Sequence, residues 1–122
     1  MLGIDAFLEI LAKAGVRHIF GNPGSTELPL NDALVADDRF QYIFGLQEVP
    51  LTAMADGYAM ASGTPGIVCV HICCGLGNSM GMLYNAHCEG TPLMILAGQQ
   101  DRRLRFEDPV LAGDMAAAAS PW

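Results

Sequence analysis

The chain is organised around residues 44–59, FGLQEVPLTAMADGYA. This stretch begins as the end of a buried strand and continues, after a single carboxylate, into an apolar helix. Glu48 is the only charged residue between Arg39 and Asp56, and a charge at such a place is costly to bury unless something pairs with it. A carboxylate there can hold or pass a proton, or it can simply cap the helix and favour its dipole. The position alone leaves both interpretations open.

Apolar strands alternate with helices on both sides of this stretch. The run 67–70 is continuously apolar, which is typical of a parallel strand that is covered on both faces. We predict strands at 16–20, 41–45, 67–70 and 93–97. We predict helices at 4–14 and 48–62, a short helix that ends at about residue 35, and another that ends at about residue 88. These spacings suit right-handed crossovers between parallel strands. The pattern predicts an α/β fold, a doubly wound and mostly parallel sheet with helices on both faces.

The bulk composition bounds the class of protein. A length of 122 residues suits one domain, and an apolar fraction of 52% is enough for a core. The net charge of −7 and the single basic cluster at residues 102–105 argue against a nucleic-acid partner. No apolar run is long enough to span a bilayer, and the N-terminus lacks the pattern of a secretory signal. We therefore expect a cytoplasmic protein without a nucleic-acid or membrane partner.

The four cysteines follow a C-x3-C-C pattern and then a long gap to Cys88. This spacing does not match the paired C-x-x-C ligands of zinc sites. Cys69 and Cys73 lie in or beside an apolar strand, where cysteine behaves as a small apolar residue. We expect reduced thiols and no metal site.

Three turns are predicted at the carboxyl ends of strands, where doubly wound sheets bind ligands. They are 22–25, 47–48 and 71–78, and we expect them to converge. Ser25, His71 and Glu48 could form a hydrolase triad there, although Ser25 lacks the G-x-S-x-G elbow, and His71 could equally be a satisfied core residue. The glycine-rich run 75–81 departs from G-x-G-x-x-G, but as a turn it could aim backbone N–H groups at a ligand.

A set of motifs stands in order along the chain: GNPGSTELP at 21–29, LQE at 46–48, ADGYA at 55–59, His71, GLGNSMG at 75–81 and AGQQ at 97–100. Together they resemble the N-terminal pyrimidine-binding domain of thiamine-diphosphate enzymes, in the branch of benzoylformate decarboxylase. The resemblance runs from the first helix to about Gln100. It implies a pyrimidine-binding domain at 1–110, followed at 111–122 by a linker or the truncated start of the next segment.

The resemblance also implies roles for individual residues. Glu48 is similar to the family's cofactor-activating glutamate, which hydrogen-bonds N1′ of the aminopyrimidine ring. His71 matches a histidine that handles protons on the substrate-derived adduct, and Ser25 matches a serine that contacts the substrate carboxylate. The residues implied to bind thiamine diphosphate are Asn22, Pro23, Gly24, Glu48, Gly75 and Asn78.

The implied activity is that of a thiamine-diphosphate-dependent carboxy-lyase acting on a small 2-oxo acid. Acetolactate synthases usually place Arg or His before the glutamate and Gln after it, whereas Gln47 and Val49 stand here and favour the decarboxylase branch. Cys73 and Cys74 replace the small Ser or Ala of relatives. An acetolactate-synthase-like or other carboligase, and a non-catalytic fragment or pairing module, are the alternatives.

The family's Gly-Asp-Gly…Asn metal motif does not occur in these 122 residues. The resemblance therefore implies that magnesium and the diphosphate are held by another domain, in the same or a partner chain. It also implies a homo-oligomer, a dimer or tetramer, when the protein is complete. We expect the chain alone to be inactive.

Overall fold

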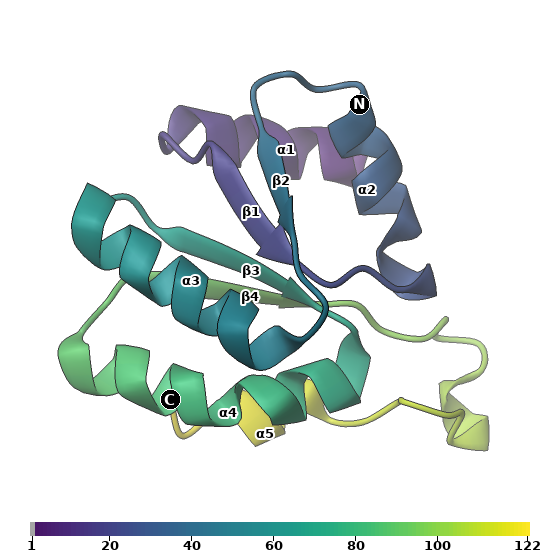
Figure 1. Cartoon of the computed structure of the whole chain (residues 1–122). Coiled ribbons are helices and arrows are strands. Elements are labelled where there is room, and N and C mark those ends of the chain that lie inside the picture. Colours follow the sequence, from purple (N-terminus) through teal and green to yellow (C-terminus); the bar gives the residue numbers. More distant parts are fainter. Residues whose placement is uncertain (1) are drawn as a thin grey trace.

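The computed structural model describes residues 2–122 and has three layers, with a parallel sheet between two pairs of helices (Figure 1). The strands are β1 (His18–Gly21), β2 (Gln41–Phe44), β3 (Gly66–Val70) and β4 (Leu93–Ala97). All neighbours pair in parallel, in the order β2-β1-β3-β4. The chain therefore winds outward from β1 to β2, returns past β1 and winds outward again through β3 and β4. The predicted doubly wound α/β fold is confirmed.

Each face of the sheet is covered by its own helices. Helices α1 (Gly3–Lys13) and α2 (Leu28–Val35) cover one face, and α3 (Glu48–Ser62) and α4 (Ile72–Glu89) cover the other. Successive side chains of a strand point to opposite faces. Accordingly, Ile67 and Cys69 of β3 pack toward α1 and α2, while Val68 and Val70 pack toward α3 and α4. All four side chains are buried, as the continuous apolar run predicts.

At the start of α3, one residue caps the helix and the next one is buried. The Gln47 side chain caps this helix, because its Oε1 accepts a hydrogen bond from the Val49 N–H at 2.8 Å. Pro50 lies in the first turn, where its missing N–H is not needed. The Glu48 carboxylate is therefore available for contacts other than the cap of its own helix.

The glycine-rich run 75–81 is helical, so the predicted turn is wrong. Helix α4 begins at Ile72, one residue after His71, and Ile72 has a left-handed φ of 48°. Glycine is a poor helix former, but here packing overrides that preference. A Cβ at Gly75 would lie 3.0 Å from the Cβ of Val70, so glycine lets α4 pass close to the end of β3.

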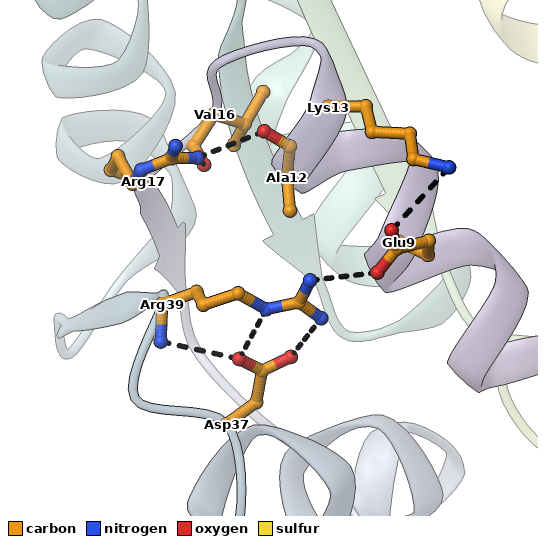
Figure 2. A network of polar contacts seen from close by, with 7 residues as sticks. All are labelled: Glu9, Ala12, Lys13, Val16, Arg17, Asp37 and Arg39. Atoms are coloured by element: carbon orange, nitrogen blue, oxygen red, sulfur yellow. Dashed lines mark hydrogen bonds and ion pairs between the residues drawn. The ribbon is translucent and has the colours of Figure 1, made fainter.

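A network of exposed ion pairs lies near the amino ends of the strands (Figure 2). Arg39, just before β2, contacts Asp37 and Glu9, each at 2.7 Å. Its guanidinium, mainly through hydrogen bonds, holds the pKa of both carboxyl groups below the usual range. Exposed pairs of this kind contribute little to stability. The network joins α1 to the loop before β2 and leaves the opposite end of the sheet free of these charges.

Residues beyond β4 return to α4. A 3₁₀ turn, η2 (Arg105–Glu107), leads to the short helix α5 (Met115–Ala119), which packs beside α4 (Figure 1). The Trp122 ring lies 5.0 Å from the Tyr84 ring, edge to face. Segment 111–122 thus lies on the α4 surface. Within residues 2–122, no helix is both long and apolar enough to cross a membrane.

Candidate functional site

Side chains from three separate segments meet at the carboxyl ends of the central strands. Asn22 directly follows β1, Glu48 opens α3, and Asn78 lies in the second turn of α4. The Asn22 Nδ2 group donates to Glu48 Oε1 at 3.1 Å, and the Asn78 Nδ2 group donates to Oε2 at 3.2 Å. Glu48 is only 6% exposed. The expected convergence of these three segments is therefore present, with Glu48 at its centre, although Asn78 lies in a helix and not in a turn.

The partners of Glu48 are neutral. Within residues 2–122, no lysine, arginine or histidine forms an ion pair with its carboxylate. A buried carboxylate without a cation loses solvation that two amide donors replace only in part. Each carboxylate oxygen has room for about two hydrogen bonds, and each accepts one here. The site can therefore take a further group that donates to Glu48 or shares a proton with it.

Small and hydroxyl side chains fix the position of Glu48. A Cβ at Gly75 would stand 3.2 Å from Glu48 Oε1, so glycine keeps this approach open. One turn along α3, the Thr52 hydroxyl donates to the Glu48 backbone carbonyl at 2.8 Å and lies 2.9 Å from the Ser79 hydroxyl. Both hydroxyl groups are fully buried. They join α3 to α4 beneath the carboxylate.

A second buried carboxylate, Glu27, pairs with His71. Glu27 ends the 3₁₀ turn η1 (Ser25–Glu27), is 4% exposed, and has its Oε2 2.9 Å from His71 Nδ1. The Ser25/His71/Glu48 triad that the sequence suggested is not formed. His71 contacts Glu27 instead, because the 3₁₀ turn returns Glu27 to the end of the sheet. Ser25 is exposed, and its side chain makes no hydrogen bond to any of residues 2–122.

Sequence reasoning missed Glu27, although a signal was present. Glu27 stands three residues after Gly24, the spacing at which an acid reaches back to a backbone N–H at the start of a helical turn. The Gly24 N–H donates to Glu27 Oε2 at 3.0 Å. A Cβ at Gly24 would overlap the His71 ring, so this glycine belongs to the His71 site. Pro23 lies beside it and is exposed.

The cysteines are free thiols in different surroundings. Cys69 is buried in β3, Cys73 is half-buried, and Cys74 and Cys88 are exposed. Burial, and to a smaller extent the charge of Glu27, raises the pKa of Cys69 to about 12. Cys73 faces Gly113, since a Cβ there would lie 3.0 Å from its Sγ. Across residues 2–122, no three His, Cys, Asp or Glu side chains gather in an arrangement that could hold a metal ion.

Sequence comparisons match this chain to known proteins over most of its length. The family model for the thiamine pyrophosphate enzyme, N-terminal TPP binding domain, matches residues 1–114. Benzoylformate decarboxylase of Pseudomonas aeruginosa is 47% identical over 108 residues, which are 88% of this chain and 20% of that protein. The mitochondrial acetolactate synthase catalytic subunit of Aspergillus candidus is 34% identical over 119 residues, 98% of this chain and 17% of that protein.

A solved structure gives the same relationship in three dimensions. The crystal structure of benzoylformate decarboxylase from Polynucleobacter necessarius matches with a TM-score of 0.89 and 38% identity, over 98% of this chain and 22% of that one. The chain thus spans about a fifth of the length of the relatives it matches. It belongs to the thiamine pyrophosphate enzyme family and corresponds to the N-terminal TPP binding domain of that family.

Proposed function

We propose that this chain is the pyrimidine-binding part of a thiamine-diphosphate-dependent 2-oxo acid decarboxylase of the benzoylformate decarboxylase type. The observation that carries the proposal is the Glu48 carboxylate. It is buried at the carboxyl ends of parallel strands, is held between two neutral amides, and has no cationic partner. A carboxylate in such a place is a candidate for proton exchange with a bound ligand.

The site fits the cofactor that the family uses. Thiamine diphosphate carries an aminopyrimidine ring whose N1′ atom can share a proton with a carboxylate, and Glu48 has unused hydrogen-bonding capacity on both oxygens. Gly75 leaves open the space where a side chain would crowd Oε1. When bound, the cofactor supplies the electron sink for loss of CO2. In the proposal, the residues that line its edge are Asn22, Pro23, Gly24, Gly75 and Asn78.

The remaining roles fall to residues of the same edge. Glu48 holds or passes a proton at N1′, and Asn22 and Asn78 keep its two oxygens in place. His71 exchanges protons with the substrate-derived group, since its ring is part-buried but not closed off. Ser25 binds the substrate carboxylate, since its exposed hydroxyl has no partner among residues 2–122 and is free to donate.

The decarboxylase branch is favoured by identity and by the residues around Glu48. The identity is 47% to a benzoylformate decarboxylase and 34% to an acetolactate synthase. Gln47 and Val49 flank the glutamate, in place of the residues usual in acetolactate synthases. Because the acetolactate synthase match nevertheless covers 98% of this chain, a carboligase that condenses two 2-oxo acids is the second candidate.

The proposed partner is a diphosphate-binding domain, in the same chain or in another subunit of a dimer or tetramer. This domain would hold magnesium and the diphosphate. Exposed apolar side chains on β2, on α3 and in the loop between them support such pairing, because Leu46 is 86% exposed and Phe44, Met54 and Met60 are exposed as well. Exposed large apolar side chains are expected where another protein covers the surface.

The test uses this chain joined to the part of Pseudomonas aeruginosa benzoylformate decarboxylase that lies beyond the matched residues, hereafter the joined enzyme. Glu48→Gln keeps the size of the side chain but removes its proton exchange, so we expect turnover of benzoylformate to fall by about 10²–10⁴-fold. Glu89→Gln, an exposed residue at the end of α4, is the matched control and should leave turnover unchanged.

Product analysis separates the candidates. Benzaldehyde and CO2 from benzoylformate support the decarboxylase, whereas acetolactate from pyruvate supports the carboligase. Near-normal turnover of the Glu48→Gln enzyme would rule out the role of Glu48. A folded joined enzyme that binds thiamine diphosphate and magnesium in calorimetry but converts neither acid would favour the non-catalytic pairing module.

A further inference from the structure

We propose that Glu27 is the positioning residue for His71, fixing the imidazole so that Nδ1 carries a hydrogen and Nε2 is the atom that exchanges a proton with the substrate. This inference rests on the proposed function and adds to it a second carboxylate with a separate task. Glu48 would serve the cofactor, and Glu27 would serve the histidine.

The contacts of Glu27 determine which partner donates. Glu27 Oε1 accepts from the Thr26 hydroxyl at 2.5 Å and from the Gly98 N–H at 3.1 Å. Its Oε2 accepts from the Gly24 N–H at 3.0 Å and lies 2.9 Å from His71 Nδ1. Two of these partners are backbone N–H groups, which can only donate. An ionised carboxylate offers about four acceptor sites, and the four partners fill them.

The hydrogen between Glu27 and His71 therefore belongs to the ring. If Nδ1 were an unprotonated acceptor, Glu27 would have to be protonated in order to donate to it. The hydrogen bonds from the three other donors to Glu27 would then lose the strength that an ionised carboxylate gives them. With the hydrogen on Nδ1, the neutral ring has its free lone pair on Nε2. When Nε2 takes up a proton, the ionised Glu27 stabilises the charged ring.

The backbone encloses the Nδ1 edge of the ring. A Cβ at Gly24 would overlap His71, and a Cβ at Gly98 would overlap Glu27 Oε1 and Thr26 Oγ1. Both glycines are therefore needed for the pair to form as it does. The His71 side chain nevertheless remains 26% exposed while that of Glu27 is 3% exposed. Because Gly24 and Glu27 cover the Nδ1 side, we infer that the exposed part of the ring includes the side that carries Nε2.

The other titratable groups around Glu27 stay neutral. Burial raises the pKa of Cys69 on β3 to about 12, and the negative charge of Glu27 contributes to this shift. Burial, Cys69 and then Glu27 also raise the pKa of Tyr42 on β2. Neither group can carry a positive charge, so neither can offset the charge of Glu27. Of the three neighbours, only His71 can do so, when its ring takes up a second proton.

The first test needs no cofactor. In the 122-residue chain, ¹⁵N chemical shifts of the imidazole nitrogens report which nitrogen is protonated, and comparison with the His71→Ala chain assigns His71 among the three histidines. We expect the Nδ1–H form in the wild-type chain and a smaller share of it in Glu27→Gln, whose amide cannot accept from all four partners. A His71 ring protonated on Nε2 alone in the wild-type chain overturns the inference.

The second test is a double-mutant cycle in the joined enzyme. Loss of a hydrogen bond to a charged group lowers kcat by about 10- to 100-fold in Glu27→Gln, with a much smaller change in KM. In the His71→Ala background, Glu27→Gln should add less than about a threefold loss, because the residue acts through the histidine. An equal loss in both backgrounds contradicts positioning and leaves Glu27 a structural residue.

A second variant covers the case in which Glu27→Gln does not fold. Gly98→Ala leaves the Glu27 and His71 side chains present but adds a methyl group that overlaps Glu27 Oε1, so it should lower kcat through His71 in the same cycle. Glu48→Gln separates the two proposals. If it abolishes turnover while Glu27→Gln and Gly98→Ala change nothing, only the role of Glu27 is lost. If Glu48→Gln is active, the proposed function itself fails.

Discussion

Replacement of Gly75 by alanine sets two opposing effects against each other in one helix. In an exposed helix interior, Gly→Ala stabilises a protein by about 0.5–1 kcal/mol. At Gly75 the added Cβ would lie 3.0 Å from the Val70 Cβ and 3.2 Å from both the Val70 carbonyl carbon and Glu48 Oε1. Extra atoms in a well-packed region cost about 1–3 kcal/mol. The crowding should win, and Gly75→Ala should be destabilising or at best neutral.

Two other glycines of α4 are matched controls. Gly77 and Gly81 lie in the same helix, and an added Cβ would have nothing within 4 Å at either position. Each Gly→Ala change there should stabilise the chain by about 0.5–1 kcal/mol. The Gly75→Ala chain should therefore melt roughly 4–12 °C below the Gly77→Ala chain, if about 1–3 kcal/mol separates them. Circular dichroism during heating measures this difference, and equal midpoints would refute the argument that glycine is needed at 75.

Two further predictions concern the core. Ser79→Ala removes a buried hydroxyl that lies 2.9 Å from both Thr52 Oγ1 and the Gly75 carbonyl oxygen. The free energy of unfolding, measured in urea, should therefore fall by about 1–2 kcal/mol. An unchanged free energy of unfolding would mean that the hydroxyl pair does not join α3 to α4. The Cys69 pKa rises from 9.0 to about 12 on folding, so the unfolded thiol ionises first. Stability should fall across pH 9–12 by up to about 1.4 kcal/mol per pH unit, and Cys69→Val should reduce that slope. An unchanged slope would refute the Cys69 contribution.

The fold could be predicted because its signals are local. The continuous apolar run at 67–70 indicated a strand covered on both faces, and β3 is that strand. Likewise, the isolated charge of Glu48 after an apolar strand left two interpretations open, a carboxylate that handles a proton or a simple helix cap. In the structure Glu48 is buried and the Gln47 side chain caps α3, while the role of Glu48 stays a prediction. A continuous apolar run and an isolated charge are visible without knowledge of any tertiary contact.

The details that escaped prediction depend on packing. The run 75–81 reads as a turn because glycine is a poor helix former, yet the approach of α4 to Val70 makes glycine at 75 favourable in a helix. Similarly, nothing in the order of the residues shows which of two carboxylates meets His71. That choice depends on the 3₁₀ turn at 25–27, which brings Glu27 to the histidine and leaves Glu48 to two amides.

The two asparagines beside Glu48 have a chemical property that an arginine or lysine would lack. A carboxamide can donate through its nitrogen or accept through its oxygen, so rotation of the group by half a turn suits a protonated carboxyl as well as an ionised one. Asn22 and Asn78 can therefore follow Glu48 through a change of charge without breaking an ion pair. A cationic neighbour would have favoured the ionised form of Glu48, whereas two neutral amides can hydrogen-bond both the ionised and the protonated form.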